Sequence, residues 1–367
     1  MKIKWESSIP KIRIHSCYYR TGMNYICGVC VLYNIINNIQ CLYIIYYMNL
    51  FLGIILFIII FLIYIHIINQ YKTSEDLEIY EMDYKSNIIL QETCDIRQPI
   101  VFEIPILNIP DFSILTEKYP RFIIHVKDLE DYASELDTIE TVQLPVSSMV
   151  ELLKNDNNGR YIIENNNEFL EESKLKKKIS KLDEILSPSC TAFSRYDFLG
   201  GSLGACTPFR YHTYTRKYLV VCEGAKIRVK MAPWEATKYL HKVSDYDAFE
   251  FRSPINIWNV QEKYTHDMDK VQILDFEVSS SNVLYIPPYW WYSIQYDGVT
   301  SGIIEYTYGT FVNRIAYIND IGRHWLQQQN ILSKSTKTLS LESNTTTIQK
   351  IQEDQEDQEE NNIDIIQ

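Results

Sequence analysis

The longest apolar stretch of the chain extends from Leu50 to Ile68 and is interrupted only by His66. A helix of about 20 apolar residues is long enough to cross the hydrocarbon core of a bilayer. A buried core helix is the alternative, but this stretch has no polar face over its length, as the helix of a soluble domain usually has. The pattern therefore predicts a membrane-spanning anchor within residues 48–70.

Polar and β-prone segments follow the apolar stretch. Residues 71–90 are polar and acidic, which is typical of a stalk. A β-prone run begins at Cys94–Ile104, and Arg121–Val126 has the composition of another strand. Three prolines between these runs predict turns. We expect one folded domain over residues 91–330.

Helical patterns appear in two later segments. The charged stretch Glu168–Lys181 predicts a solvated helix. Residues 311–330 read as an amphipathic helix, and the apolar residues spaced for one face are Ile315, Ile318, Ile321 and Trp325. This face suggests a homodimer formed through the 311–330 helix. Residues 331–367 are rich in Ser, Thr, Gln and acids, which predicts a disordered acidic tail.

Composition narrows the class of protein. The 367 residues include 28 Tyr and 14 Phe, which suits a mainly β core. The formal net charge is −12, and no basic stripe with interleaved aromatic residues appears, which argues against a nucleic-acid surface. The chain is therefore expected to bind a membrane and an unidentified protein partner, but no nucleic acid.

The charges beside the anchor predict its orientation. Five basic residues and one acid precede Cys41, whereas acids follow the anchor, among them Glu75, Asp76 and Glu78. This asymmetry favours a cytosolic N-terminus and a lumenal or exterior domain. Translation from Met48 would remove the basic flank and leave residues 1–47 untranslated. If these residues are made, they show no recognisable pattern and are expected to be disordered.

The eight cysteines are divided equally by the anchor. Cys27 and Cys30 have the spacing of a zinc or redox half-motif, but no second half accompanies them. The four cysteines after the anchor fit either buried thiols or two disulfides, depending on the compartment. The sequence leaves this choice open.

Two motifs carry the candidate chemistry. One is the run from Val283 to Tyr292, which contains two prolines and then paired tryptophans. The other extends from Thr207 to His212 and reads Thr-Pro-Phe-Arg-Tyr-His. Residues two apart on a strand point to the same side, so Arg210 and His212 are expected to share one face.

Together these motifs resemble the Jumonji C-type, cupin-8 branch of oxygenases that includes asparaginyl hydroxylases. The resemblance is clearest from Ser194 to Thr310 and implies a double-stranded β-helix, a cupin or jelly-roll barrel, with flanking helices. In that family a His-x-Asp pair and a distant His bind Fe(II), which activates oxygen with 2-oxoglutarate. This chain has Arg210, His212 and Tyr292 at the three positions. This chain also resembles membrane-anchored cupin-like proteins of large DNA viruses.

The substitutions remove the expected metal ligands. The Arg210 guanidinium stays protonated and has no lone pair to donate. At 4 Å and an effective dielectric near 20, two unit charges repel by about 4 kcal/mol, and a divalent ion about doubles this. His212 with only the Tyr292 phenol is a poor Fe(II) site. We therefore expect no metal, no cofactor and no catalytic residue.

Two further residues match the family's positions for the far carboxylate of 2-oxoglutarate. The resemblance implies that Thr207 and Lys226 could line a carboxylate pocket, with Arg210 as a second positive pole. The alternative is that Lys226 points outward, because the chain has one residue more than the family between Arg210 and Gly224.

Three functions remain open at this point. The first is a membrane-anchored, catalytically inactive cupin-like domain used for binding or assembly. The second is an active hydroxylase that binds Fe(II) and 2-oxoglutarate with unorthodox ligands. The third is a purely structural membrane or virion protein. Trp290 and Trp291 do not decide among them, since strand alternation alone would place one in the core and the other against a neighbouring element.

Overall fold

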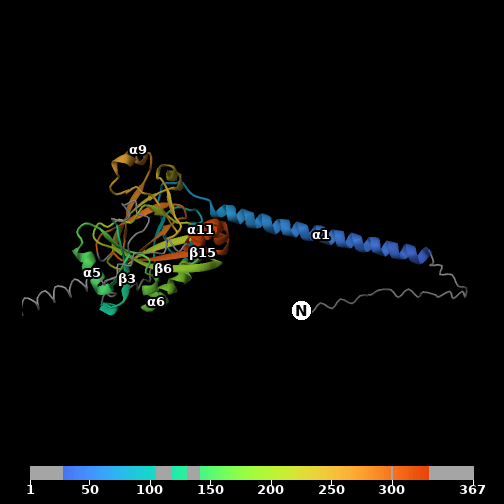
Figure 1. Cartoon of the computed structure of the whole chain (residues 1–367), viewed down its shortest axis with the longest axis horizontal. Coiled ribbons are helices and arrows are strands. Elements are labelled where there is room, and N and C mark those ends of the chain that lie inside the picture. Colours follow the sequence, from blue (N-terminus) through green and yellow to red (C-terminus); the bar gives the residue numbers. More distant parts are fainter. Residues whose placement is uncertain (1–27, 105–116, 130–140, 299–300, 330–367) are drawn as a thin grey trace, which may run out of the picture. The chain divides into compact units, whose positions relative to one another are not determined.

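The computed structural model describes residues 28–104, 117–129, 141–298 and 301–329. It divides into two units, Met1–Ile63 and Tyr64–Gln367. The predicted N-terminal segment before residue 28, the turns at Pro105 and Pro110 and the acidic tail after residue 330 lie outside the described residues. The described part of the first unit is helical, and the second unit is the β domain (Figure 1).

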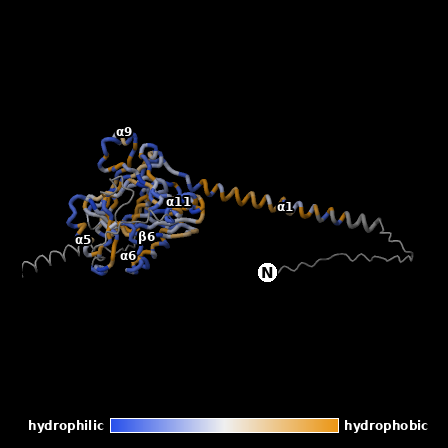
Figure 2. Tube along the Cα trace, viewed as in Figure 1, coloured by the Kyte–Doolittle hydropathy of each residue, from blue (hydrophilic) through white to orange (hydrophobic). Residues whose placement is uncertain are grey.

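Helix α1, Gly28–Gln70, contains the apolar stretch. Its segment Leu42–Gln70 is long and apolar enough to cross a membrane, and none of the side chains in its most apolar part is buried. Figure 2 shows the hydrophobic residues along this helix, in contrast to the mixed colouring of the β domain. The exposure of this most apolar part agrees with a membrane-spanning helix rather than with a core helix.

The larger sheet has the strand order β1-β2-β13-β8-β15-β6-β5-β3-β4. Its pairings are antiparallel except that of β1 with β2. The strands are β1 Tyr80–Asp83, β2 Ile100–Glu103, β3 Ile123–Asp128, β4 Thr141–Pro145, β5 Tyr161–Ile163, β6 Thr191–Gly201, β8 Arg216–Val221, β13 Asn282–Ile286 and β15 Ile303–Thr310.

The smaller sheet has the order β10-β11-β7-β14-β9-β12, and all its pairings are antiparallel. Its strands are β7 Arg210–Tyr211, β9 Lys226–Ala232, β10 Val243–Asp245, β11 Glu250–Arg252, β12 Leu274–Ser279 and β14 Trp291–Tyr296. In β9 the burial alternates, so that Ile227 and Val229 face the core while Lys226 and Arg228 face solvent.

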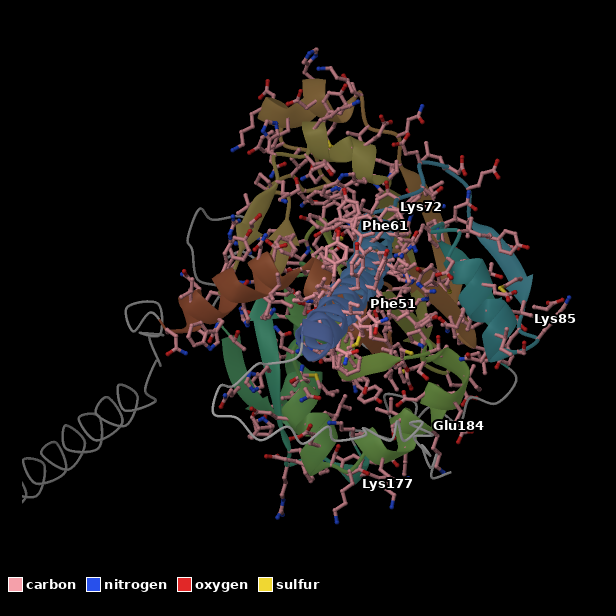
Figure 3. The ribbon with its side chains drawn as sticks, turned by 90° about the vertical axis from the view of Figure 1, so that its right-hand side faces the viewer. Phe51, Phe61, Lys72, Lys85, Lys177 and Glu184 are labelled. Atoms are coloured by element: carbon pink, nitrogen blue, oxygen red, sulfur yellow. The ribbon has the colours of Figure 1, made fainter. Side chains whose placement is uncertain are left out.

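Short helices flank the sheets. They are α2 Asn87–Cys94, α5 Val146–Asn155, α6 Asn167–Glu172, α7 Lys176–Ile179, η1 Ser180–Leu182, α8 Asp183–Leu186, η2 Trp234–Tyr239, η3 Glu262–Tyr264, α9 Thr265–Met268, α10 Phe311–Ala316 and α11 Ile318–Gln328. Lys85, Lys177 and Glu184 project outward from this domain (Figure 3). The predicted mainly β fold with flanking helices and a preceding apolar helix is confirmed.

The structure differs from the sequence-based boundaries in four places. Helix α1 begins at Gly28, inside the segment 1–47 that was expected to be untranslated or disordered. Strand β1 pairs with β2, so the sheet begins inside the expected stalk, 71–90. The helix expected over Glu168–Lys181 is broken where Lys174 adopts a positive φ of 61°. The amphipathic helix expected over 311–330 is divided at Tyr317 into α10 and α11.

Buried apolar side chains form two clusters in the β domain. Trp290 belongs to the larger cluster, and its indole N–H donates to the Arg97 carbonyl at 3.0 Å. Trp291 belongs to the smaller cluster and donates to Thr237 Oγ1 at 2.8 Å. The expected alternation of the paired tryptophans is therefore confirmed, and each buried N–H has a partner.

Candidate functional site

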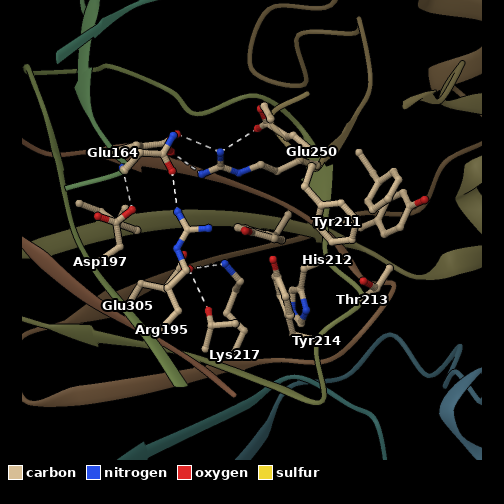
Figure 4. Close-up of a pocket in the computed structure, with 18 of the residues that line it drawn as sticks. Glu164, Arg195, Asp197, Tyr211, His212, Thr213, Tyr214, Lys217, Glu250 and Glu305 are labelled. Atoms are coloured by element: carbon tan, nitrogen blue, oxygen red, sulfur yellow. Dashed lines mark hydrogen bonds and ion pairs between the residues drawn. The ribbon is translucent and has the colours of Figure 1, made fainter. Parts of the chain in front are cut away.

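Arg210, His212 and Tyr292 line one cavity of about 90 Å³, and Figure 4 shows this cavity with His212 labelled. Arg210 on β7 pairs across the smaller sheet with Tyr292 on β14. The guanidinium carbon of Arg210 lies 5.8 Å from the centre of the Tyr292 ring, and the His212 ring centre is 6.3 Å from the same ring. The convergence expected from the two motifs is therefore present in the structure.

Two carboxylates hold the Arg210 guanidinium. Nη1 donates to Glu164 Oε2 at 3.0 Å and to Glu250 Oε1 at 2.8 Å, while Nη2 donates to Glu164 Oε1. The Arg210 and Glu164 side chains are 11 % and 3 % exposed. Bidentate pairing of this kind is the strongest geometry for an arginine–carboxylate contact.

Glu164 is the centre of this charge cluster, because Lys127 Nζ also lies 3.3 Å from its Oε2. Burial by itself would raise the pKa of Glu164, but the charges of Arg210 and Lys127 outweigh burial and lower the pKa to about 2. The pKa of Arg210 is raised well above its ordinary range, since the attraction of Glu164 exceeds the opposing effect of burial. Both groups therefore remain charged at neutral pH.

A second buried ion pair lines the same cavity. Lys217 Nζ on β8 lies 2.5 Å from Glu305 Oε1 on β15, and the Thr307 hydroxyl donates to the same oxygen at 2.9 Å. Burial opposes the charged form of each partner, but the attraction between them raises the pKa of Lys217 and lowers the pKa of Glu305. The Lys217 ammonium also lies 5.9 Å from the centre of the Tyr292 ring.

His212 is buried and neutral. Its Nε2 is 3.0 Å from the Ile286 carbonyl oxygen, which can only accept, so Nε2 carries the proton. Nδ1 therefore has a free lone pair, and it has no hydrogen-bond partner within the described ranges. Burial, and next the charge of Lys217, lowers the pKa of His212 to about 3.

Asp197 fixes the turn beside the cavity. Its carboxylate accepts hydrogen bonds from the backbone N–H groups of Asn165 at 2.7 Å and Asn166 at 2.6 Å. Burial, and then the charge of Glu305, raises the pKa of Asp197 to about 6. Arg195 donates to the Asn165 side chain at 2.8 Å, at the exposed rim.

The residues of this cavity do not fit an Fe(II) ion. Among its lining residues, four basic side chains balance four acidic ones, so the cavity attracts neither cations nor anions strongly. The Arg210 guanidinium has no lone pair to donate and is held by Glu164 and Glu250, whereas His212 Nδ1 has a lone pair without a partner in the described residues. In the part of the chain that the structure describes, no three His, Cys, Asp or Glu side chains are grouped to hold a metal.

Thr207 and Lys226 lie outside this cavity. Thr207 is buried and accepts a hydrogen bond from the Ile294 N–H at 2.9 Å, which ties its loop to β14. Lys226 is 46 % exposed and pairs with Glu277 on β12 at 2.6 Å. The carboxylate pocket expected between Arg210 and Lys226 is therefore not formed, because Lys226 occupies an outward-facing position of β9. This is the alternative that the extra residue before Gly224 allowed.

Several members of the charge cluster were not identified from the sequence. Lys217 and Glu305 each lie inside an apolar strand, and a charge in such a strand is a signal of a buried partner. Glu164 directly follows the apolar strand β5 and gives the same signal. The partners themselves come from distant strands, so local spacing could not have shown which acid meets which base.

No disulfide joins the cysteines that the structure describes after α1. Cys94 and Cys222 are buried, Cys206 is partly buried and Cys190 is exposed. The structure therefore agrees with free thiols and not with two disulfides.

Comparison with protein-family models and with curated proteins finds no match for this chain.

Proposed function

We propose that this protein is a membrane-anchored, cupin-like domain used for binding or assembly, and that it is a catalytically inactive relative of the Fe(II)- and 2-oxoglutarate-dependent hydroxylases. The observation that carries this proposal is the clamp of Glu164 and Glu250 on Arg210. An internal cation takes the position at which those enzymes have a metal ligand.

The electrostatic energies around Arg210 argue against a bound metal ion. A divalent ion about 4 Å from Arg210 would be repelled by about 8 kcal/mol at an effective dielectric near 20. Displacing the guanidinium would leave Glu164 buried without its main partner, and breaking a buried pair costs about 3–5 kcal/mol. Whether Arg210 stays or is displaced, the cost cancels much of the affinity of an ordinary metal site.

The same proposal includes the arrangement in the membrane. The chain crosses the bilayer once, through the Leu42–Gln70 part of α1. The basic residues before the anchor and the acids after it support a cytosolic N-terminus and a lumenal or exterior β domain. The fold within the β domain is a double-stranded β-helix, which the two largely antiparallel sheets support.

Calorimetry on the full chain in detergent tests the proposal. Mn(II), as a stable substitute for Fe(II), is titrated with and without 2-oxoglutarate, and an active Jumonji C-type hydroxylase serves as the control. We expect no saturable heat from the chain under conditions in which the control binds. Saturable micromolar binding of Mn(II) would overturn the proposal and favour an active hydroxylase with unorthodox ligands.

A further inference from the structure

Helix α11 packs on the β domain through its polar side. His324 Nδ1 lies 2.6 Å from the Tyr246 carbonyl, and Gln328 donates to the Asp247 carbonyl at 2.9 Å. The Tyr246 hydroxyl also donates to Asp320 at 3.2 Å. An amphipathic helix on a soluble domain normally turns its apolar side inward. In α11 the hydrogen-bonding residues face the domain together with Ile321, which packs against the smaller apolar cluster, so Ile321 does not share a face with the exposed Ile315, Ile318 and Trp325 as expected.

The apolar side chains of α10 and α11 are consequently exposed. We call this surface the outer face, and it consists of Phe311 at 67 %, Ile315 at 49 %, Ile318 at 63 %, Trp325 at 61 % and Leu326 at 63 % exposure. Ile318 and Trp325 are seven residues apart and therefore lie on one side of the helix. A group of large exposed apolar side chains marks a binding surface.

The end of the membrane segment lies beside the outer face. Within the second unit, Ile67 packs against the smaller apolar cluster. The Tyr71 hydroxyl donates to the Ala316 carbonyl, and the centres of the Tyr71 and Tyr317 rings are 5.5 Å apart. Ala316 and Tyr317 form the junction of α10 and α11, between Ile315 and Ile318. The first residue after the apolar segment is thus fixed to this junction.

This attachment places the junction close to a bilayer surface. The apolar segment ends at Gln70, and a headgroup region about 5–8 Å thick lies beyond the hydrocarbon core on each side. One tyrosine side chain connects that end to Ala316. Trp, Phe and Leu side chains on one side of a helix are the composition that binds in such an interface.

We propose that the outer face of α10–α11 rests on the lipid surface and gives the β domain a second contact with the membrane beside its anchor. Arg314 is exposed on α10 and adds attraction to anionic headgroups, whereas Arg323 donates to the Tyr246 hydroxyl at 2.9 Å on the side that faces the domain. The contact would hold the β domain in one orientation on the bilayer, and so determine which of its surfaces meets a partner.

Quenching of tryptophan fluorescence tests the proposal on the full chain in liposomes of neutral and anionic phospholipid. The lipids are brominated at shallow acyl positions, and the lipid-dependent quenching of the wild type is compared with that of Trp325→Phe. We expect the variant to lose most of the quenchable fluorescence. Trp258→Phe is the control, because Trp258 donates to Ser293 within the β domain and should leave the quenching unchanged.

A second pair of variants separates the lipid surface from a second copy of the chain. Leu326→Ser should reduce the quenching of Trp325, whereas Leu203→Ser, which alters a similarly exposed leucine outside α10 and α11, should not. Equal quenching in the wild type and Trp325→Phe would overturn the proposal. The proposal would also be overturned if Trp325 were unquenched and two copies of the chain, present at low density in the liposomes, cross-linked through α11. The outer face would then be a dimer interface.

Discussion

At the scale of single residues, the β domain depends on charges that are buried in pairs. Lys217 and Glu305 are 8 % and 10 % exposed, and they satisfy one another across neighbouring strands. Removing one member leaves the other as an uncompensated buried charge, which is far more costly than losing both.

Lys217→Met should strongly destabilise the β domain. The substitution leaves Glu305 buried with the Thr307 hydroxyl as its nearest donor, and we expect a loss of about 3–5 kcal/mol in the free energy of unfolding. Urea unfolding of the full chain in detergent measures the loss. Lys226→Met is the matched control, because its exposed pair with Glu277 is screened by water, and it should change little. Equal effects of the two variants would refute the prediction.

His212 should make the folded state sensitive to acid. An unfolded histidine titrates near pH 6.5, whereas burial lowers the folded-state pKa of His212 to about 3. The unfolded chain therefore binds one more proton between these values. The stability from keeping His212 neutral is complete above about pH 6.5 and falls as the pH decreases, by about 1.4 kcal/mol per pH unit.

The variant His212→Gln isolates this effect, because its amide nitrogen is as many bonds from Cβ as His212 Nε2 and can still donate to the Ile286 carbonyl. Between pH 6.5 and 5 we expect the wild type to lose about 2 kcal/mol relative to the variant. The comparison with a variant is needed because Asp197, with its pKa raised to about 6, stabilises the folded state on acidification and opposes the trend. Parallel pH profiles for wild type and variant would refute the prediction.

Sequence reasoning identified part of this site. Arg210, His212 and Tyr292 were expected to converge, because their motifs have a characteristic order and strand alternation places Arg210 and His212 together. Glu164 was missed, because its role depends on a pairing across 46 residues that no local pattern encodes. Lys226 was ambiguous for a related reason, since a shift of one residue reverses the side of a strand on which it lies.

At the scale of elements, glycines in strands and helices differ in whether the structure leaves space for a side chain at their position. A Cβ added at Gly201 on β6 would collide with the ring of Tyr296, which is fully buried, whereas one at Gly322 on α11 would meet no atom within 4 Å. The same substitution should therefore have opposite effects at these two positions.

Gly201→Ala should lower the free energy of unfolding by about 1–3 kcal/mol through overpacking. Gly322→Ala should raise it by about 1 kcal/mol, because alanine favours a helix over glycine. Thermal unfolding of both variants beside the wild type measures the two shifts. If Gly201→Ala left the free energy of unfolding unchanged, the close packing of β6 would be contradicted.

The class of the elements was easier to predict than their ends. The apolar stretch and the β-rich composition gave an anchor and a mainly β domain because both depend on long runs of residues. The division of α10 and α11 at Tyr317 was not visible, since the periodicity of Ile315, Ile318 and Ile321 continues across it. Tyr317 is buried against Tyr289 and Tyr71, and this tertiary packing has no local signature.

At the scale of the whole molecule, N-glycosylation tests the orientation of the chain in the membrane. Asn344 begins an Asn-Thr-Thr sequence, which is glycosylated only if that end of the chain enters the secretory lumen. With a cytosolic N-terminus, we expect expression in animal cells to give a glycosylated form that an endoglycosidase converts to lower mass. Asn344→Gln should remove the difference. An unglycosylated wild type that is protected from added protease only at its N-terminal side would indicate the reverse orientation.

The proposed loss of a metal site is tested most directly at the pairing of Arg210 with Glu164. A double-mutant cycle with Arg210→Met, Glu164→Gln and their combination measures it by urea unfolding of the full chain. We predict that each single variant is destabilised and that the combination recovers part of the loss, with a coupling energy of at least about 1.5 kcal/mol. Additive effects within about 0.5 kcal/mol would show that Arg210 is free for another ligand and would contradict the account.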